Sequence, residues 1–328
     1  MIKLEVTNNT NLFFNKKSPN TLIVKVSDKV YKIELTYDEK EIIKNIFSNE
    51  FINLDNGKNY KNIISYLENI GAIRRVSTPE LSYSNTKYEK TLKYFSSYSK
   101  SYLSIPLKLS TKKILIIGVG GIGCEIINHL IAADIKNYVL IDNDTVHSTN
   151  LNRQFCFTPN DIDNYKVNII SKYIKERIPT ANIQVFNTKI TKKDDLIKII
   201  ASQKKIDLII NCADTPFYEI QKITLLASLK FRIPCVFAGV GITDGYFGPF
   251  LEKKSTKERF LKKINFILDN SELIGPCSGS FSPTNSMISS FLAKDIIFYL
   301  AGLSKYVKSM NNKVELLIDK LEISEEEI

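Results

Sequence analysis

Hydrophobic and polar positions follow one pattern before about residue 111 and a different one after it. In the first part, short alternating or apolar runs predict strands at residues 2–6, 21–26, 30–35 and 72–76. Apolar residues at helical spacing predict helices at residues 37–47 and 60–70. Thr36, with Glu39 three residues later, fits the N-cap of the first helix. Three strands, two helices and a further strand predict a small winged-helix-like domain over residues 1–76.

From residue 111 the pattern is typical of a parallel sheet. Residues 112–117 form an almost continuously apolar run, as expected of a strand buried on both faces. Further strands are predicted at 138–141, 183–186, 208–211 and 236–238. Helices are predicted between them, at 124–133, 166–177, 194–202 and 217–229. This alternation predicts an α/β fold with a doubly wound, Rossmann-like, mostly parallel sheet over residues 111–328.

Residues 77–110 differ from both flanking regions. They are rich in Ser, Thr, Tyr and Lys, and only residues 88–98 have helical spacing. We therefore expect a linker here. The full length of 328 residues, 44% of them hydrophobic, is sufficient for the two unequal domains that this linker would join.

Charge and targeting patterns narrow the possible partners. The net charge of +10 arises from 45 basic residues interleaved with 35 acidic ones, so no basic stripe points to nucleic acid. The first 14 residues lack a signal-peptide pattern, and no uninterrupted apolar run approaches the roughly 18 residues of a membrane span. We expect neither a nucleic acid nor a membrane as partner.

The number and spacing of the cysteines indicate the redox compartment of the protein and whether a zinc site is expected. Five are widely scattered, at Cys124, Cys156, Cys212, Cys235 and Cys277. An odd number without a framework predicts reduced thiols in a cytoplasmic protein. Because no CxxC pair is present, no zinc site is expected.

A glycine-rich turn carries the first candidate chemistry. The predicted strand ending at Ile117 runs directly into Gly118-Val119-Gly120-Gly121-Ile122-Gly123 and then a helix. Gly118 permits a tight turn, Gly120 and Gly121 let phosphate oxygens approach the backbone, and Gly123 allows close helix–strand packing. About 20 residues on, Asp142 ends the next predicted strand and can accept hydrogen bonds from ribose hydroxyls. These features predict nucleotide binding without distinguishing ATP from a dinucleotide.

The segment that follows favours ATP over a dinucleotide. Arg153 can hold phosphate oxygens with its fork of donors, and Lys166 can act on them as a point charge. Asn150 and Gln154 add neutral donors. Asp214, at the end of a predicted strand, is placed to hold Mg²⁺, which prefers oxygen ligands. An enzyme that splits ATP between the α- and β-phosphates needs these groups, whereas a dehydrogenase does not.

At these residues the chain resembles the ThiF/MoeB/ubiquitin-activating superfamily. The resemblance rests on residues 118–123, on the pattern DxDxVxxxNLxRQ at residues 142–154, and on Lys166 and Cys212-Ala213-Asp214. Members adenylate a carboxyl terminus with MgATP and release pyrophosphate. The resemblance implies that Asp142 holds the ribose and that Asp144 belongs to the nucleotide site. It further implies triphosphate contacts from Asn150, Arg153, Gln154 and Lys166, and Mg²⁺ coordination by Asp214.

Within this superfamily the chain is similar to the branch that adenylates microcin C-type precursor peptides. The similarity extends to residues 213–217, 247–249 and 281–285. It implies an N-terminal peptide-clamp domain, a ribosomally made precursor peptide as substrate, and a homodimer. Two features depart from relatives: the paired CxxC zinc ligands are missing, and Lys90 stands where an Arg-Tyr-x-Arg segment supplies an arginine to the partner subunit's ATP.

Three other interpretations remain open. A catalytically degenerate partner protein would use the same two domains only to deliver a peptide, but it has no need of Asp142, Arg153, Lys166 and Asp214 together. An NAD-dependent oxidoreductase would not need the triphosphate-binding charges. A sulfur-carrier-protein adenylyltransferase would share the chemistry and differ in its substrate.

Overall fold

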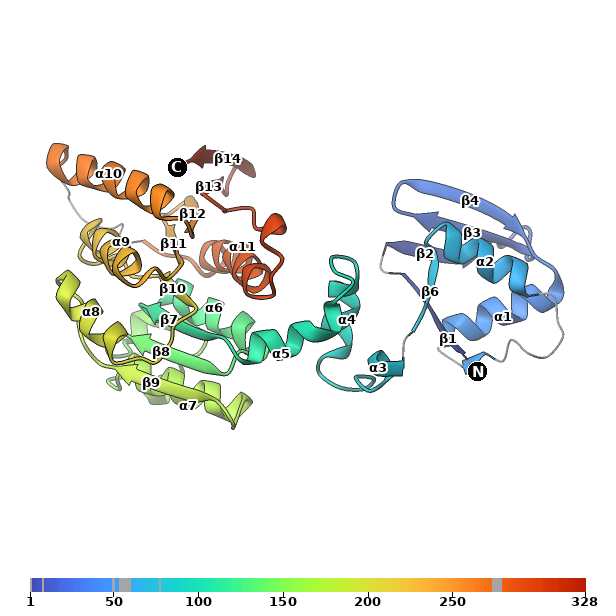
Figure 1. Cartoon of the computed structure of the whole chain (residues 1–328), viewed down its shortest axis with the longest axis horizontal. Helices are drawn as coiled ribbons and strands as arrows, with labels where there is room; N and C mark the ends of the chain where they lie inside the picture. Colours follow the sequence, from blue (N-terminus) through green and yellow to red (C-terminus); the bar gives the residue numbers. More distant parts are fainter. Residues whose placement is uncertain (1, 8, 49–50, 53–59, 77, 273–278) are drawn as a thin grey trace. The chain divides into compact units, whose positions relative to one another are not determined.

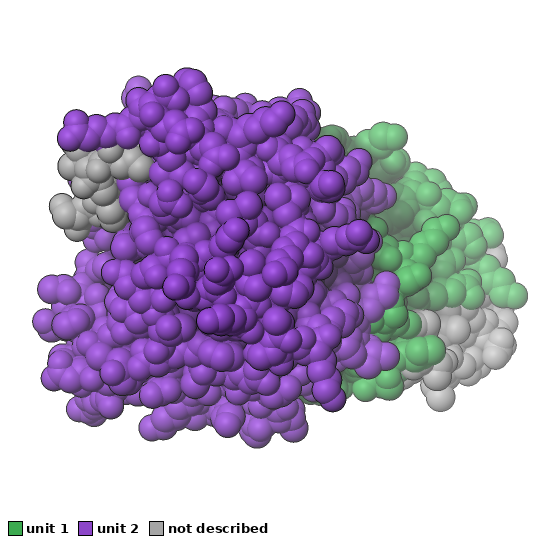
Figure 2. All heavy atoms as spheres, turned by 60° about the vertical axis from the view of Figure 1, so that its left-hand side comes forward, with its two compact units in different colours: residues 1–104 green, residues 105–328 purple. Residues whose placement is uncertain are grey.

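The computed structural model describes residues 2–7, 9–48, 51–52, 60–76, 78–272 and 279–328. The chain divides into two compact units, residues 1–104 and 105–328, which Figure 2 colours green and purple. In each unit, buried hydrophobic side chains form a core of their own. None of the helices described is long and apolar enough to cross a membrane.

The first unit is built on two small sheets. One has the order β5-β1-β6, and the other has the order β2-β3-β4. The strands are β1 (Ile2–Val6), β2 (Thr10–Phe14), β3 (Thr21–Val26), β4 (Lys29–Glu34), β5 (Phe51–Ile52) and β6 (Ile73–Arg75). Two helices, α1 (Tyr37–Phe47) and α2 (Lys61–Asn69), share a core with them. The small N-terminal domain is thus present as predicted, although β2 was not anticipated.

Helix α1 begins where the sequence predicted. The backbone N–H of Glu39 donates to Thr36 Oγ1 at 3.3 Å, and the backbone N–H of Thr36 donates to Glu39 Oε2 at 2.8 Å. This reciprocal capping box satisfies two donors that the helix itself cannot. The predicted N-cap at Thr36 is therefore confirmed.

The unit continues beyond residue 76. It includes α3 (Thr78–Leu81), α4 (Glu89–Ser96) and the 3₁₀ turn η1 (Tyr102–Ser104). Arg74 on β6 forms ion pairs with Glu5 on β1 and Glu80 on α3, and Lys93 on α4 pairs with Glu5 at 3.1 Å. Tyr102 also donates to Glu80, at 2.5 Å. This network fastens residues 78–104 to the β1–β6 ladder.

The second unit contains one eight-stranded sheet, with the order β14-β13-β12-β11-β10-β7-β8-β9. The five strands from β11 to β9 run parallel, as the sequence predicted. They are β7 (Lys113–Ile117), β8 (Asn137–Ile141), β9 (Asn182–Phe186), β10 (Leu208–Asn211) and β11 (Cys235–Val240). The remaining three, β12 (Asp244–Leu251), β13 (Asn312–Leu317) and β14 (Glu322–Glu327), form an antiparallel extension that was not predicted.

Helices cover both faces of this sheet, as Figure 1 shows. Helix α6 packs against α11, while α9 packs against both α8 and α10. Residues 114–117 of β7 are all buried, which explains their continuous apolar character. The helices are α5 (Ile105–Ser110), α6 (Gly121–Ala132), α7 (Lys166–Arg177), α8 (Lys193–Ala201), α9 (Glu219–Phe231), α10 (Lys254–Asn270) and α11 (Ser282–Leu300), with 3₁₀ turns η2 (Ser148–Asn150), η3 (Pro159–Asp161) and η4 (Ser304–Tyr306).

The order of the parallel strands identifies where a ligand is expected. From β7 the chain proceeds to β8 and β9 on one side, and then returns to β10 and β11 on the other. Open α/β sheets bind ligands at such a switch point, beyond the carboxyl ends of the strands. A cavity of about 680 Å³ lies there, within the 300–1,000 Å³ range of small-molecule sites.

Candidate active site

The glycine-rich turn joins β7 to α6 and forms one wall of this cavity. Gly118 has φ of +84°, and a Cβ on it would lie 2.9 Å from the backbone nitrogen of Ala213. A Cβ on Gly123 would lie 2.3 Å from the Gly118 carbonyl oxygen, so only glycine lets α6 start this close to β7. No side chain caps α6, and its first-turn N–H groups are therefore available to an anion. Gly118, Gly120 and Gly121 line the cavity, whereas Gly123 lies behind it.

Asp142 ties the end of β8 to this turn. One of its carboxylate oxygens accepts from the Val119 N–H at 2.8 Å, and the other accepts from the Asp144 N–H at 2.8 Å. Burial raises the pKa of Asp142, and the two backbone donors and Lys166 act in the opposite direction. Each oxygen keeps a second lone pair, so the carboxylate can also accept from ribose hydroxyls.

Lys166 reaches the same cavity from the first turn of α7. Its ammonium group is buried and pairs with Asp144 Oδ2 at 2.9 Å, and its backbone N–H donates to the Asp144 carbonyl at 3.0 Å. The Asp144 side chain is 57% exposed. The pair thus places a desolvated positive charge in the wall of the cavity, next to a carboxylate that solvent can reach.

The loop at residues 148–157 carries the other predicted phosphate-binding groups. Arg153 Nη1 donates to the Thr149 carbonyl at 2.9 Å and to Asn152 Oδ1 at 2.8 Å, which fixes its guanidinium. Gln154 is only 2% exposed, and its Oε1 has no hydrogen-bond partner among the described residues. Its amide nitrogen would lie 3.7 Å from a Cβ on Gly120, so Gln154 packs directly against the phosphate loop. Arg153 and Gln154 both line the cavity.

Asn150 has a different position from these two residues. It is buried, it is not part of the cavity wall, and its Oδ1 accepts from the His147 N–H at 3.0 Å. Its carbonyl accepts from the N–H groups of Arg153 and Gln154 at 3.1 and 3.0 Å. The structure therefore places Asn150 underneath the loop, where it orients the two residues that do line the cavity.

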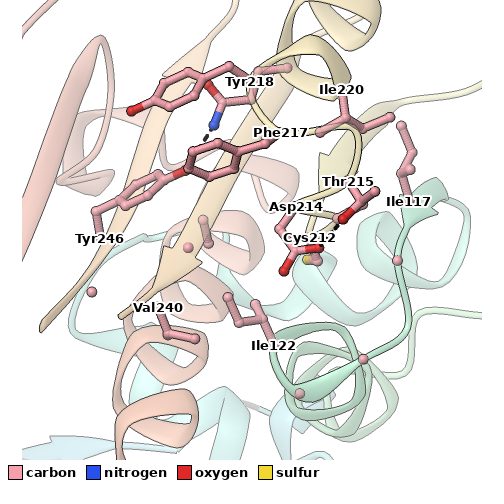
Figure 3. A pocket seen from close by; sticks show the side chains of 18 of the residues that line it. Ile117, Ile122, Cys212, Asp214, Thr215, Phe217, Tyr218, Ile220, Val240 and Tyr246 are labelled. Carbon is pink, nitrogen blue, oxygen red and sulfur yellow. Dashed lines mark hydrogen bonds between the residues drawn. The ribbon is translucent and has the colours of Figure 1, made fainter. Parts of the chain in front are cut away.

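Asp214 follows β10 and also lines the cavity. It is exposed, and one carboxylate oxygen accepts from Thr215 Oγ1 at 3.1 Å (Figure 3). Among the described residues, no three His, Cys, Asp or Glu side chains lie close enough together to hold a metal ion. Asp214 fits a Mg²⁺ ion whose other ligands are phosphate oxygens and water, the usual arrangement for this ion.

The structure adds cavity residues that the sequence did not reveal. Thr188, Lys189 and Ile190 follow β9 at the same edge of the sheet as Asp142 and Asp214. A general signal could have found these three, because they come directly after a parallel strand. Tyr246 and Lys313 lie on the antiparallel strands β12 and β13, which lacked any such signal. Figure 3 shows Tyr246 with Phe217, Tyr218 and Asp214 around the cavity.

Among the described cysteines, only Cys212 lines the cavity. Of the five cysteines, Cys277 falls outside the described residues, and the other four are free thiols. Burial raises the pKa of the Cys212 thiol to about 12, so it stays protonated. Lys90 belongs to α4 of the other unit.

Comparison with known proteins decides the family. The ThiF family model matches residues 101–325, more than half of the chain. The chain belongs to the ThiF family. A curated relative, the adenylyltransferase and sulfurtransferase UBA4 of Meyerozyma guilliermondii, is 30% identical over 151 residues, which is 45% of this chain and 34% of that protein. In the curated relatives compared, the matched region spans between 19% and 42% of the relative's length, which is less than half.

Solved structures of MccB share the whole fold of this chain. E. coli MccB with AMPCPP and MccA has a TM-score of 0.71 and 21% identity, and the match covers 99% of this chain and 96% of that one. The microcin C7 biosynthetic enzyme MccB with N-formylated MccA gives 0.72 and 20%, with the same coverage. At this identity the likeness establishes the fold, which includes both the small N-terminal domain and the α/β domain.

Proposed function

We propose that this protein adenylates a carboxyl group or C-terminal residue of a ribosomally made precursor peptide, using MgATP and releasing pyrophosphate. The main support is the single cavity that brings together the phosphate loop, Asp142, Arg153, Lys166 and Asp214. Family membership supports adenylation. The similarity to MccB, which covers both units and includes structures with MccA, supports a peptide as substrate.

In this proposal, each part of the nucleotide has its own group of residues in the cavity wall. The first-turn N–H groups of α6 bind the phosphates, and the carboxylate of Asp142 accepts from the ribose hydroxyls. Arg153 and Lys166 offset negative charge on the phosphates, while Asp214 would hold Mg²⁺. That ion would supply charge neutralisation for the departing pyrophosphate.

The bond changes follow from these positions. A carboxylate oxygen of the peptide attacks the α-phosphorus, and the bond from that phosphorus to the oxygen bridging to the β-phosphate breaks. Pyrophosphate leaves with the electron pair, so no proton transfer is required. Preorganised positive charge around the phosphates is the main contribution that the protein makes to such a step.

The N-terminal unit is assigned to peptide capture. Its β2-β3-β4 sheet ends at β4, which pairs only with β3 among the described strands. A leader segment of the precursor peptide can add a strand at such an edge through main-chain hydrogen bonds. As in the family branch that the sequence resembles, we propose a homodimer in which Lys90 approaches the partner's nucleotide.

Two alternatives share parts of this site. A sulfur-carrier-protein adenylyltransferase is favoured by the similarity to UBA4, whose name combines adenylyl and sulfur transfer. It predicts a small protein ending in Gly-Gly as the substrate. A catalytically inactive delivery protein predicts peptide binding without ATP turnover.

The test combines the purified protein with MgATP and any short peptide encoded beside its gene. Released pyrophosphate and peptide mass are followed together. Asp214→Ala should lower the rate about 10²–10³-fold, because it removes one charge-stabilising group. Asp194→Ala, which changes an exposed carboxylate in the first turn of α8, is the matched control and should leave the rate unchanged.

Each outcome identifies a function. A peptide that gains AMP, or loses water while ATP becomes AMP, establishes peptide adenylation. Turnover with a Gly-Gly carrier alone assigns the sulfur-carrier alternative. Tight peptide binding without ATP turnover, equal in wild type and Asp214→Ala, would rule out the enzyme and favour the delivery protein.

A further inference from the structure

Away from the phosphate loop, the cavity has a second wall, with Tyr246 at its centre. Tyr246 on β12 pairs with Gly239 on β11 and with Glu315 on β13, so the three residues share one face of the sheet. A Cβ on Gly239 would lie 2.5 Å from the Tyr246 ring. Any larger residue at position 239 would displace this ring, so the glycine fixes where the ring lies.

The hydroxyl of Tyr246 is oriented as a hydrogen-bond donor. Gln221 Nε2 donates to Tyr246 Oη at 3.0 Å, and this is the hydroxyl's only hydrogen bond to the described residues (Figure 3). The phenolic proton therefore remains to be donated. Burial raises the pKa of Tyr246, and the neighbouring Tyr218 and Asp214 act in the same direction. Tyr246 consequently stays protonated at neutral pH and presents a fixed donor to the cavity.

Lys313 adds positive charge to the same wall. Its ammonium nitrogen lies 4.7 Å from the centroid of the Tyr246 ring, and it also forms an ion pair with Glu315. An ammonium group has three N–H donors, and Glu315 occupies only part of that capacity. Both Tyr246 and Lys313 line the cavity. The Tyr246 hydroxyl and the Lys313 ammonium group are thus two hydrogen-bond donors in one wall. Such donors fit a ligand group that has acceptors and no donors.

We propose that Tyr246 binds the carboxylate of the peptide residue that is adenylated, with Lys313 supplying the attraction for its charge. This inference rests on the proposed function and names the residue that selects the reacting group. Tyr246 donates to one carboxylate oxygen and leaves the other free to attack the α-phosphorus. A carboxylate has only acceptors and a negative charge, so it matches both donors, whereas a carboxamide brings N–H donors and no charge.

The first experiment measures recognition of the reacting group without a peptide. Protein saturated with a non-hydrolysable ATP analogue is titrated by calorimetry with N-acetylaspartate or with N-acetylasparagine amide. The first probe has side-chain and terminal carboxylates, and the second has none. Wild type should prefer N-acetylaspartate about tenfold or more, the range for a hydrogen bond to a charged group. Tyr246→Phe should abolish most of this preference and leave the affinity for the ATP analogue unchanged.

Two further variants separate recognition from folding. Tyr299→Phe removes a phenolic hydroxyl that donates to Glu252 at 2.8 Å outside the cavity, and it should preserve the preference. Lys313→Met changes a partly exposed side chain and should reduce the preference about threefold through lost charge. Equal binding of both probes by wild type, no binding of either, or a preference unchanged by Tyr246→Phe would overturn the inference.

Turnover distinguishes failure of the inference from failure of the proposed function. If wild type releases pyrophosphate with a peptide and Tyr246→Phe has the same kcat/KM, the inference is wrong and the function stands. If no peptide supports pyrophosphate release but N-acetylaspartate binds in a Tyr246-dependent way, the carboxylate site stands and the function is wrong. The expected result is a kcat/KM for the peptide that falls about tenfold or more in Tyr246→Phe, with the KM for ATP unchanged.

Discussion

At the scale of single residues, the decisive feature of the site is a buried lysine whose partner is exposed. Lys166 has an exposed side-chain fraction of 6%, and Asp144 one of 57%. A buried ammonium group needs a compensating anion, and here an exposed carboxylate provides it. The triphosphate of ATP is a second anion that can take this role. Asp144 therefore holds the Lys166 ammonium group in place through their 2.9 Å ion pair.

Asp144→Asn tests this account. The change should destabilise the protein by about 1–2 kcal/mol, because Lys166 loses its anion while the exposed position limits the cost. MgATP should restore more stability to the variant than it adds to wild type, since its phosphates replace the missing charge. Thermal melting with and without MgATP measures both effects. Asp194→Asn is the matched control, and equal shifts by MgATP in wild type and Asp144→Asn would contradict the account.

Several candidate site residues could be predicted because they lie just after the carboxyl ends of predicted strands. Asp142 and Asp214 were predictable because Asp142 directly follows β8 and Asp214 comes three residues after β10, and parallel strands gather their carboxyl ends at one edge. The position of Asn150 was not predictable, because its role under the loop depends on backbone hydrogen bonds that no spacing reveals. Tyr246 was missed because it lies within an antiparallel strand, where a tyrosine is an ordinary β-residue.

At the scale of elements, the junction of β7 and α6 combines two requirements that different glycines meet. Gly123 allows the helix to approach the strand, since a Cβ there would meet the Gly118 carbonyl at 2.3 Å. Gly120 meets no such obstacle, because its nearest neighbour is Gln154 Nε2 at 3.7 Å. Gly120 lines the cavity, where we propose that its backbone faces the phosphates. We therefore propose that Gly123 serves packing and that Gly120 serves nucleotide binding.

The two alanine variants should separate these roles. Gly123→Ala should cost about 1–3 kcal/mol of stability, because the clash is with backbone that cannot move aside. Gly120→Ala should leave stability within about 0.5 kcal/mol and weaken ATP-analogue binding about tenfold or more. Chemical denaturation and calorimetric titration give the two quantities. A stable Gly123→Ala protein, or a Gly120→Ala protein with full affinity, would show that the roles are assigned wrongly.

The elements themselves were predictable to different degrees. Strands buried on both faces give continuous apolar runs, so β7, β8 and β10 could be identified directly. Strand β14 could not, because all six of its residues are exposed and four are glutamates. Helix α9 begins at Glu219, two residues later than predicted, because Tyr218 has φ of +57° and cannot continue a helix. Strand pairing determines β14, and backbone conformation at Tyr218 determines the start of α9. The local sequence pattern indicates neither of them.

At the scale of the whole molecule, each of the two units has its own hydrophobic core, and the proposed roles of the two units differ. Every residue that lines the cavity belongs to residues 105–328, whereas the proposed peptide capture belongs to residues 1–104. The first unit depends on a charge network, in which Arg74 compensates the buried carboxylates of Glu5 and Glu80. Burial opposes the charge on Arg74, but Glu80 and Glu5 more than offset this and raise its pKa.

This division predicts that damage to one unit spares the other. Arg74→Met removes the cation that two buried carboxylates share, although Glu5 keeps its ion pair with Lys93, and should destabilise the first unit by about 3 kcal/mol. Arg75→Met is the matched neighbour, since Arg75 pairs with Glu68 at 2.8 Å on the surface and should cost no more than about 1 kcal/mol. Calorimetry should show an early, separate transition only for Arg74→Met, which should bind the ATP analogue normally and lose peptide affinity. If nucleotide and peptide binding fell together in Arg74→Met, the two units would have to be treated as one cooperative body, and the separate assignment of capture and catalysis would fail.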